Sequence, residues 1–188
     1  WAINQLDSAD AEVRLAALKA IDIAQLSAAG PRLTVILGDA KRPTVERTAA
    51  LKALRTTAGA TAAPLLMELI NRDEPTALKV DALRGLAAAS PEQAREVATK
   101  LLDGTDAPLI AEAIAVLGAT KTGAKLVGER YTARKLPKEL FPRVSEVVKK
   151  FAADKDMARL HSEVMKGSLL LTMDAARAEE ISKLVATK

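Results

Sequence analysis

The sequence has no cysteine and a single histidine, and aromatic residues make up only 2% of it. Without cysteine there is no disulfide, no thiol nucleophile and no cysteine-ligated zinc or iron–sulfur centre, and one histidine cannot supply a site that needs two imidazoles. The glycines are scattered, without a Gly-rich phosphate-binding run that ends in Lys-Ser or Lys-Thr. We therefore expect no catalytic residue, no metal site and no cofactor in this chain, and the domain itself is predicted not to be an enzyme.

Long apolar runs are also missing. The strongest apolar stretches are far shorter than the roughly 20 residues that a membrane-spanning helix needs. The chain begins with Trp1 and shows no basic segment followed by an apolar stretch and a small-residue cleavage site, so no signal peptide is predicted. We expect a piece of a larger protein with no membrane span. The compartment is left open, because a chain without cysteine suits a reducing and an oxidising environment equally.

What the chain does contain is aliphatic and helix-forming. Hydrophobic residues make up 49% of it, and since aromatics are so few, its core must be built from Ala, Leu, Ile and Val. No segment shows the strict apolar and polar alternation of a half-buried strand, and alanine-rich segments favour helix. The sequence therefore predicts an all-α protein.

An internal repeat organises the chain. The hexad AALKAI returns at intervals of 31 to 34 residues, each time with a small residue second and large apolar residues third and sixth; only the fifth copy replaces the small residue, with Val147. The copies are AALKAI at 16–21, AALKAL at 49–54, DALRGL at 81–86, EAIAVL at 112–117 and EVVKKF at 146–151. The second and sixth positions are four apart and share one helical face, which we predict to be the buried face.

Between the hexads lies a second helical pattern, separated by breaks rich in Asp, Gly, Pro, Asn and Thr. Each unit is then a helical hairpin that must stack on its neighbours to bury its apolar face. The predicted fold is an α-solenoid of about five helical hairpins in a single domain over 1–188. The predicted repeats are 1–22, 28–56, 60–88, 91–118 and 123–152, followed by a C-terminal helical cap over 155–188.

These residues resemble the HEAT repeats and, more loosely, the related armadillo-type helical repeats. The segment from Asp10 to Ile21 is similar to the Asp, Val-Arg, Ala and Ala-Leu pattern of the second HEAT helix. Its basic position returns as Arg47 and Lys79 but is Ile110 in the fourth unit. The resemblance covers roughly 1–151 and implies a scaffold that holds a protein partner or a neighbouring domain, since such arrays serve many unrelated partners.

A more particular resemblance concerns the C-terminal part of the chain. Its layout from Leu136 onward is similar to helical domains of large secreted bacterial proteins, in which HEAT-like repeats lie between a propeller-type sugar-dehydrogenase-like domain and a c-type cytochrome domain. That resemblance implies a spacer or docking domain in an extracytoplasmic redox protein. The haem motif Cys-x-x-Cys-His is absent from these residues, so haem binding is not assigned to them.

The recurring cations Arg14, Arg47 and Lys79 are interpreted as structural. In the family such residues often bridge to loop acids of an adjacent unit. The expected acids here are Asp10, Asp39 and Asp73. The lone His161 lies at the edge of an apolar face, and we interpret it as a boundary residue rather than a ligand.

A local basic patch is the one candidate binding site. Segment 124–150 holds eight basic residues and three acidic ones, a net charge of +5 in a chain whose total is +4. Such a patch attracts an acidic protein, a membrane surface or nucleic acid, although charges on a helical hairpin are commonly only its solvated face. Tyr131, Phe141 and Phe151 give little support for base stacking, so a nucleic-acid-binding module is the alternative to a protein scaffold. The candidate residues are Lys125, Arg130, Arg134, Lys135, Lys138, Arg143, Lys149 and Lys150.

Overall fold

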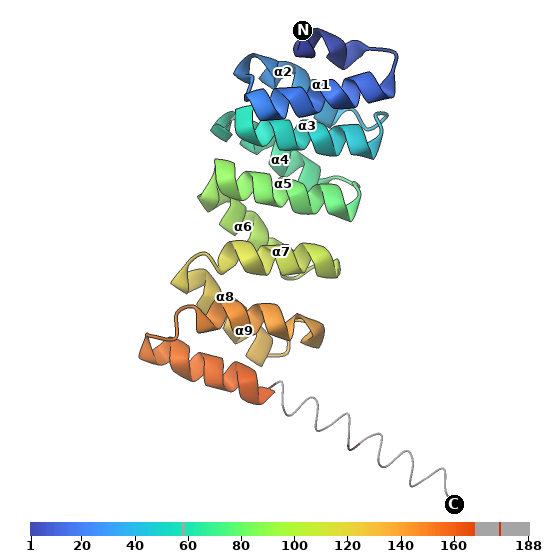
Figure 1. Ribbon diagram of the computed structural model, residues 1–188. Helices are drawn as coiled ribbons and strands as arrows, with labels where there is room; N and C mark the ends of the chain where they lie inside the picture. Colours follow the sequence, from blue (N-terminus) through green and yellow to red (C-terminus); the bar gives the residue numbers. More distant parts are fainter. Residues whose placement is uncertain (58, 168–176, 178–188) are drawn as a thin grey trace, which may run out of the picture. The chain divides into compact units, whose positions relative to one another are not determined.

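The protein is built from helices. The computed structural model describes residues 1–57, 59–167 and 177, and none of these lies in a β-strand (Figure 1). The α-helices are α1 (Ala11–Ala24), α2 (Gly30–Gly38), α3 (Thr44–Thr57), α4 (Ala63–Asn71), α5 (Thr76–Ala89), α6 (Pro91–Leu101), α7 (Ala107–Leu117), α8 (Lys121–Thr132) and α9 (Phe141–Lys149). Short 3-10 helices are η1 (Ala2–Asp7), η2 (Ser27–Ala29), η3 (Gly59–Ala62) and η4 (Lys138–Leu140).

The predicted fold class, an all-α solenoid of helical hairpins, is confirmed. The breaks predicted from turn-forming residues fall between α2 and α3, between α4 and α5 and between α6 and α7. A further helix over 155–167 begins the predicted cap. The rest of that cap, apart from residue 177, lies outside the described residues.

The chain divides into two compact units, Trp1–Ala98 and Thr99–Lys188, here called the N-terminal and C-terminal units. The prediction that all repeats form one domain stays a prediction.

In the N-terminal unit the hexad-bearing helices form one layer. Helix α3 packs against both α1 and α5, and Figure 1 shows these three helices side by side. Helices α2 and α4 contact each other and pair with α3 and α5 as hairpins. The unit is therefore a stack of hairpins in two layers, as the repeat pattern predicts.

The predicted buried face of the hexad is confirmed. The small second residue is fully buried in four copies, and the large third and sixth residues beside it are 2% exposed or less. In the fifth copy, the larger Val147 is 9% exposed and Phe151 is half-buried. The small side chains allow neighbouring helices to approach closely, and the large ones fill the remaining space. The four small residues are Ala17, Ala50, Ala82 and Ala113.

Helix ends are fixed by short polar side chains and turn geometry. The Asp10 carboxylate accepts a hydrogen bond from the backbone N–H of Glu12 at 2.8 Å, and Asp106 and Thr120 cap α7 and α8 in the same way. Helix α1 ends at Ala24, and the φ of 50° at the following residue, Gln25, lies in the left-handed region that favours glycine. The N–H of Leu26 then donates to the carbonyl of Ile21.

Two glycines bring the helices of the C-terminal unit close together. A Cβ added at Gly118, the residue after α7, would lie 2.6 Å from Cβ of Val147 in α9. A Cβ at Gly128 in α8 would lie 2.8 Å from Cδ2 of Leu160 in helix 155–167. Helices α7, α8 and α9 contact one another, and the close approach at Gly118 forms the base of a cleft.

Candidate functional site

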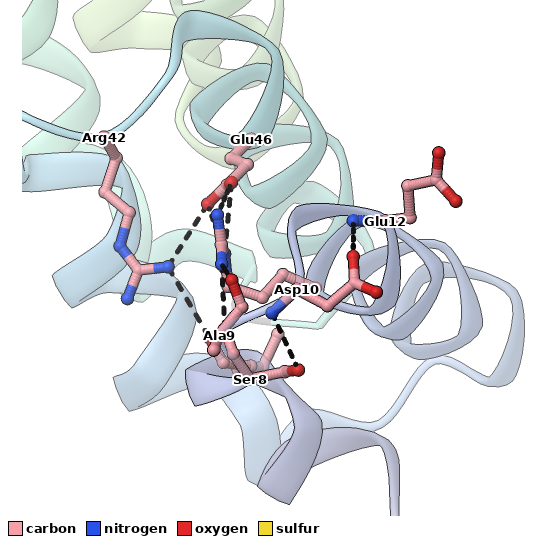
Figure 2. Close-up of polar contacts among 8 residues, drawn as sticks. Ser8, Ala9, Asp10, Glu12, Arg42 and Glu46 are labelled. Carbon is pink, nitrogen blue, oxygen red and sulfur yellow. Dashed lines mark hydrogen bonds and ion pairs between the residues drawn. The ribbon is translucent and has the colours of Figure 1, made fainter.

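A buried carboxylate and two arginines link successive repeats in the N-terminal unit. Glu46 in α3 is 1% exposed, and the guanidinium of Arg14 in α1 lies 2.6 Å from one of its oxygens, from Nη2 to Oε1. Arg42 reaches the other oxygen at 3.2 Å. Arg14 also donates from Nη1 to the carbonyl oxygens of Ser8 and Ala9, at 2.8 and 3.0 Å. Figure 2 shows Arg42 and Glu46 turned toward each other above Ser8 and Ala9, so this cluster ties α1 and the turn before it to α3.

A second ion pair, in which both side chains are buried, links the next repeat. The Arg47 side chain is 3% exposed and that of Glu74 is 5% exposed. The two groups form a bidentate pair, with Nη2–Oε1 of 2.6 Å and Nη1–Oε2 of 2.7 Å. Nε of Arg47 donates to the carbonyl oxygen of Leu37 at 3.0 Å. This pair joins α3, the end of α2 and the loop before α5.

The ion pairs shift the pKa values of their carboxylates. The hydrogen bonds from Arg14 hold the pKa of Glu46 below its usual value, although burial acts in the opposite direction. Arg47 does the same to the pKa of Glu74. In the C-terminal unit the hydrogen bond from Lys121 lowers the pKa of Asp154. All three carboxylates thus hold their charge in the folded protein, as structural ion pairs do.

The predicted bridging role of Arg14 and Arg47 is correct, but the predicted acids are wrong. Asp10 caps α1 instead, and Asp39 accepts the backbone N–H of Lys41 at 3.0 Å. An Asp side chain is short and satisfies nearby backbone donors, whereas the longer Glu side chain reaches the next helix. Asp73 is exposed, and its neighbour Glu74 forms the ion pair with Arg47.

The eight residues of the predicted basic patch differ in what they do. Lys125 lies 3.8 Å from Glu129 of the next helical turn, and Arg130 pairs with Asp103 with only 21% of its side chain exposed. The other six side chains are exposed and form no ion pair with any residue that the structure describes. We call these six the basic surface: Arg134, Lys135, Lys138, Arg143, Lys149 and Lys150.

Part of the basic surface borders a cleft of about 510 Å³ that lies wholly within the C-terminal unit. Its apolar base is formed by Ala115, Gly118 and Val147 of the α7–α9 contact. Its charged rim is formed by Arg143, Glu146, Lys149 and Lys150. Ligand pockets commonly have this size and this combination of an apolar lining with a few charged groups.

The sequence pattern did not reveal the cleft, because its base depends on the distance between α7 and α9. Gly118 is the one sequence feature that could have indicated it. A residue without a side chain after a hexad is where a neighbouring helix can come closest.

The aromatic residues near the basic surface are buried or half-buried. Tyr131 is 5% exposed, and its ring centroid lies 6.1 Å from that of Phe141, which is half-buried, as is Phe151. None of the three offers an exposed ring for stacking on a base.

His161 contacts Ser145 rather than the adjacent Ser162. Its Nε2 lies 3.1 Å from Oγ of Ser145, and Oγ of Ser145 also lies 3.6 Å from Sδ of Met165. A nucleophile–base pair needs a third group that orients the histidine, and no such contact to His161 is found among the described residues.

The part of the chain that the structure describes has no group of three His, Cys, Asp or Glu side chains placed to hold a metal ion. Within the same residues, no helix combines the length and the apolar character needed to cross a bilayer.

Comparison with known proteins gives little. No protein-family model matches the sequence, and no curated protein is similar to it. A solved structure that resembles the chain is the complex of CpcE and CpcF of phycocyanin lyase from Nostoc sp. PCC7120, with 21% sequence identity and a TM-score of 0.45. The match covers 89% of this chain and 66% of that one, just under two thirds of its length. It identifies no substrate or partner for this chain.

The same comparison contradicts the prediction that the domain is not an enzyme, because the similar structure belongs to a phycocyanin lyase. That prediction rested on the missing cysteines and on the lack of familiar catalytic motifs. Helical repeats do not by themselves exclude catalysis, since activity depends on individual sites and not on the fold.

Proposed function

We propose that the chain is a helical-repeat interaction domain that binds an acidic protein, or an acidic neighbouring domain of its own parent, through the basic surface of its C-terminal unit. One observation carries the proposal: six exposed cations lie within 134–150, and none has an ion-pair partner among the described residues. The same segment holds only two acids, so its net charge is +4 and the rest of the chain sums to zero. A concentrated field of one sign favours and accelerates association with a partner of opposite sign.

Neighbouring ion pairs support a fixed surface. Arg130 in α8 pairs with Asp103, and Lys121 at the start of α8 pairs with Asp154, which precedes helix 155–167. These contacts join α8 to the segments on either side of it. A surface that is already ordered loses less conformational entropy on binding than one that must be ordered by its partner.

A protein partner fits the surface better than nucleic acid does. Tyr131 is buried and the other two nearby aromatic rings are half-buried, so none is a fully exposed platform for stacking on bases. Glu139 and Glu146 lie among the six cations, and a carboxylate repels a phosphate backbone but accepts the N–H donors that a polypeptide provides.

The proposal is tested by fluorescence anisotropy with labelled poly-glutamate and labelled duplex DNA as probes, from about 50 to about 200 mM salt. We expect poly-glutamate to bind and to weaken as salt is raised. Changing all six cations of the basic surface to Gln is expected to lower the affinity by about tenfold or more, since charge-assisted contacts contribute about 1.5–3 kcal/mol each.

A control variant removes three positive charges elsewhere. The variant Lys19→Gln/Lys155→Gln/Lys166→Gln loses exposed lysines outside the basic surface and should bind poly-glutamate like the parent. Absence of poly-glutamate binding at the lowest salt would overturn the proposal. So would retention of duplex DNA at the highest salt when poly-glutamate has dissociated, a result that favours a nucleic-acid-binding module.

We further propose, on the sequence resemblance alone, that the parent is an extracytoplasmic redox protein in which a c-type cytochrome domain follows this one. A peptide map of the native parent tests this. A covalent haem peptide downstream of Lys188 would support the proposal, and a parent without haem would overturn it.

A further inference from the structure

The cleft between α7 and α9 has chemistry that the basic surface as a whole lacks. Three cations and one carboxylate surround an apolar base, whereas the remaining cations of the basic surface do not line it. We propose that this cleft binds a short acidic peptide segment, in which a carboxylate side chain stands next to an aliphatic one. This inference rests on the proposed function and names the chemistry of the partner at that surface.

Helix stability does not explain the presence of a cation at position 143. Arg143 lies in the first turn of α9, and that turn contains no acidic residue. A cation at a helix N-terminus is unfavourable because the positive end of the helix dipole lies there. Arg143 forms no ion pair with any residue that the structure describes. Lys149, by contrast, lies in the last turn, where a cation stabilises the helix. A local rule broken without compensation in the free protein is typical of a binding site.

The carboxylate on the rim selects the class of ligand. Glu146 is exposed and lies one turn from both Arg143 and Lys150, yet it forms an ion pair with neither. A phosphate-rich ligand has only acceptors and would be repelled by Glu146. A peptide has backbone N–H donors for Glu146 and carboxylates for the cations, so a peptide alone satisfies all four charged groups.

The base of the cleft selects for an apolar neighbour. Ala115, Gly118 and Val147 expose apolar surface between the charges, and the buried Val148 fixes α9 from behind. Because Gly118, the residue after α7, has no side chain, Val147 of α9 packs directly against it and completes the apolar floor. Burial of a leucine-sized side chain there would contribute apolar contact that a purely acidic segment cannot supply.

The experiment uses a labelled, terminally blocked peptide Asp-Leu-Glu-Leu and its matched control Asp-Gly-Glu-Gly. Binding is measured by anisotropy, and its place is read from NMR shifts of the Gly118 amide and the Val147 methyl groups. We expect saturable binding with shifts at both residues and weaker binding of the glycine control. Arg143→Gln/Lys149→Gln/Lys150→Gln should lower the affinity by about tenfold or more.

A second triple variant separates the cleft from the rest of the basic surface. Arg134→Gln/Lys135→Gln/Lys138→Gln removes the same charge away from the cleft and should weaken poly-glutamate binding far more than it weakens Asp-Leu-Glu-Leu binding. Circular dichroism checks that each variant is folded, which is expected because all six positions are exposed.

Three results would overturn the inference. They are equal affinity for the leucine and glycine peptides, displacement of the leucine peptide by inorganic phosphate at equal concentration, and a concentration-dependent dimer in sedimentation whose contact already covers Val147. If poly-glutamate still binds in any of these cases, the proposed function stands and only the assignment to the cleft fails.

Discussion

Arg47 and Glu74 form a bidentate ion pair that is almost fully shielded from water and that joins two successive repeats. Their side chains are 3% and 5% exposed. A buried charge without a partner is very unfavourable, so each residue makes the other necessary. The pair fixes the spacing of α3 and the loop before α5 more specifically than the aliphatic face of the hexad alone can do.

Removal of the arginine should therefore destabilise the N-terminal unit strongly. Arg47→Met leaves the carboxylate of Glu74 buried without a partner and is expected to lower the free energy of unfolding by about 3–5 kcal/mol. The double variant Arg47→Met/Glu74→Leu should recover part of that loss but not all of it, because the carbonyl of Leu37 still loses its donor. Urea unfolding followed by circular dichroism measures both changes.

An ion pair with an exposed lysine provides the control for that experiment. Lys52 lies 3.3 Å from Asp22 with 74% of its side chain exposed. Lys52→Met should therefore change stability by less than about 0.5 kcal/mol. A loss in Arg47→Met no larger than in Lys52→Met would mean that the Arg47–Glu74 pair is not buried in solution.

The lowered pKa values of Glu46 and Glu74 predict loss of stability in acid. Both carboxylates bind a proton more readily in the unfolded chain than in the folded one. Their contribution is therefore fully present above the unfolded pKa of about 4.3 and is lost as the pH falls through the lower pKa of the folded state. Urea unfolding at a series of pH values between about 6 and about 3 should show this decline.

A variant without one of the pairs tests the cause of the decline. Arg47→Met/Glu74→Leu has one fewer carboxylate with a lowered pKa, so its stability should fall less steeply with decreasing pH. An unchanged slope would assign the acid sensitivity to other groups, such as Asp154 beside Lys121.

The end of α1 offers a stabilising substitution. Gln25 has φ 50° and ψ 45°, a conformation that costs a residue with a Cβ about 1 kcal/mol more than it costs glycine. Gln25→Gly should raise the free energy of unfolding by about 0.5–1 kcal/mol. Gln25→Ala keeps the Cβ and should bring no such gain. Equal thermal midpoints for the two variants would show that α1 does not end in a left-handed residue.

The sequence predicts the repeats and their buried face because helical periodicity and residue size act locally. In each of the first four hexads, for example, a small residue precedes a large one, as Ala17 precedes Leu18, and both are buried. The partners of Arg14 and Arg47 could not be predicted in the same way. They depend on how far one helix is shifted along the next, which decides whether a Glu or an Asp comes within reach.

In the candidate site, too, local features could be predicted from the sequence, whereas contacts between helices could not. Charge density along 124–150 indicates a basic patch, but it does not distinguish the paired Lys125 and Arg130 from the exposed cations. Only the packing of α8 brings Arg130 to Asp103. The cleft is even harder to predict from the sequence, because its apolar base comes from two helices about 30 residues apart in sequence.

The base of the cleft can be tested through its glycine. Gly118→Ala would place a Cβ 2.6 Å from Cβ of Val147, so α7 and α9 must move apart, and we expect a loss of about 1–3 kcal/mol. Gly123→Ala should cost more, because its Cβ would lie 2.8 Å from the carbonyl carbon of Leu117, and backbone yields less readily than a side chain. Thermal unfolding followed by circular dichroism measures both variants.

Gly30→Ala is the matched control, since a Cβ at that helical position meets nothing within 4 Å. It should be neutral or stabilise the protein by up to about 1 kcal/mol, because alanine restricts the unfolded chain. The expected order of stability is therefore Gly30→Ala, then Gly118→Ala, then Gly123→Ala. If Gly118→Ala were as stable as Gly30→Ala, then α7 and α9 would not approach closely, and the cleft would lack the apolar base on which peptide binding depends.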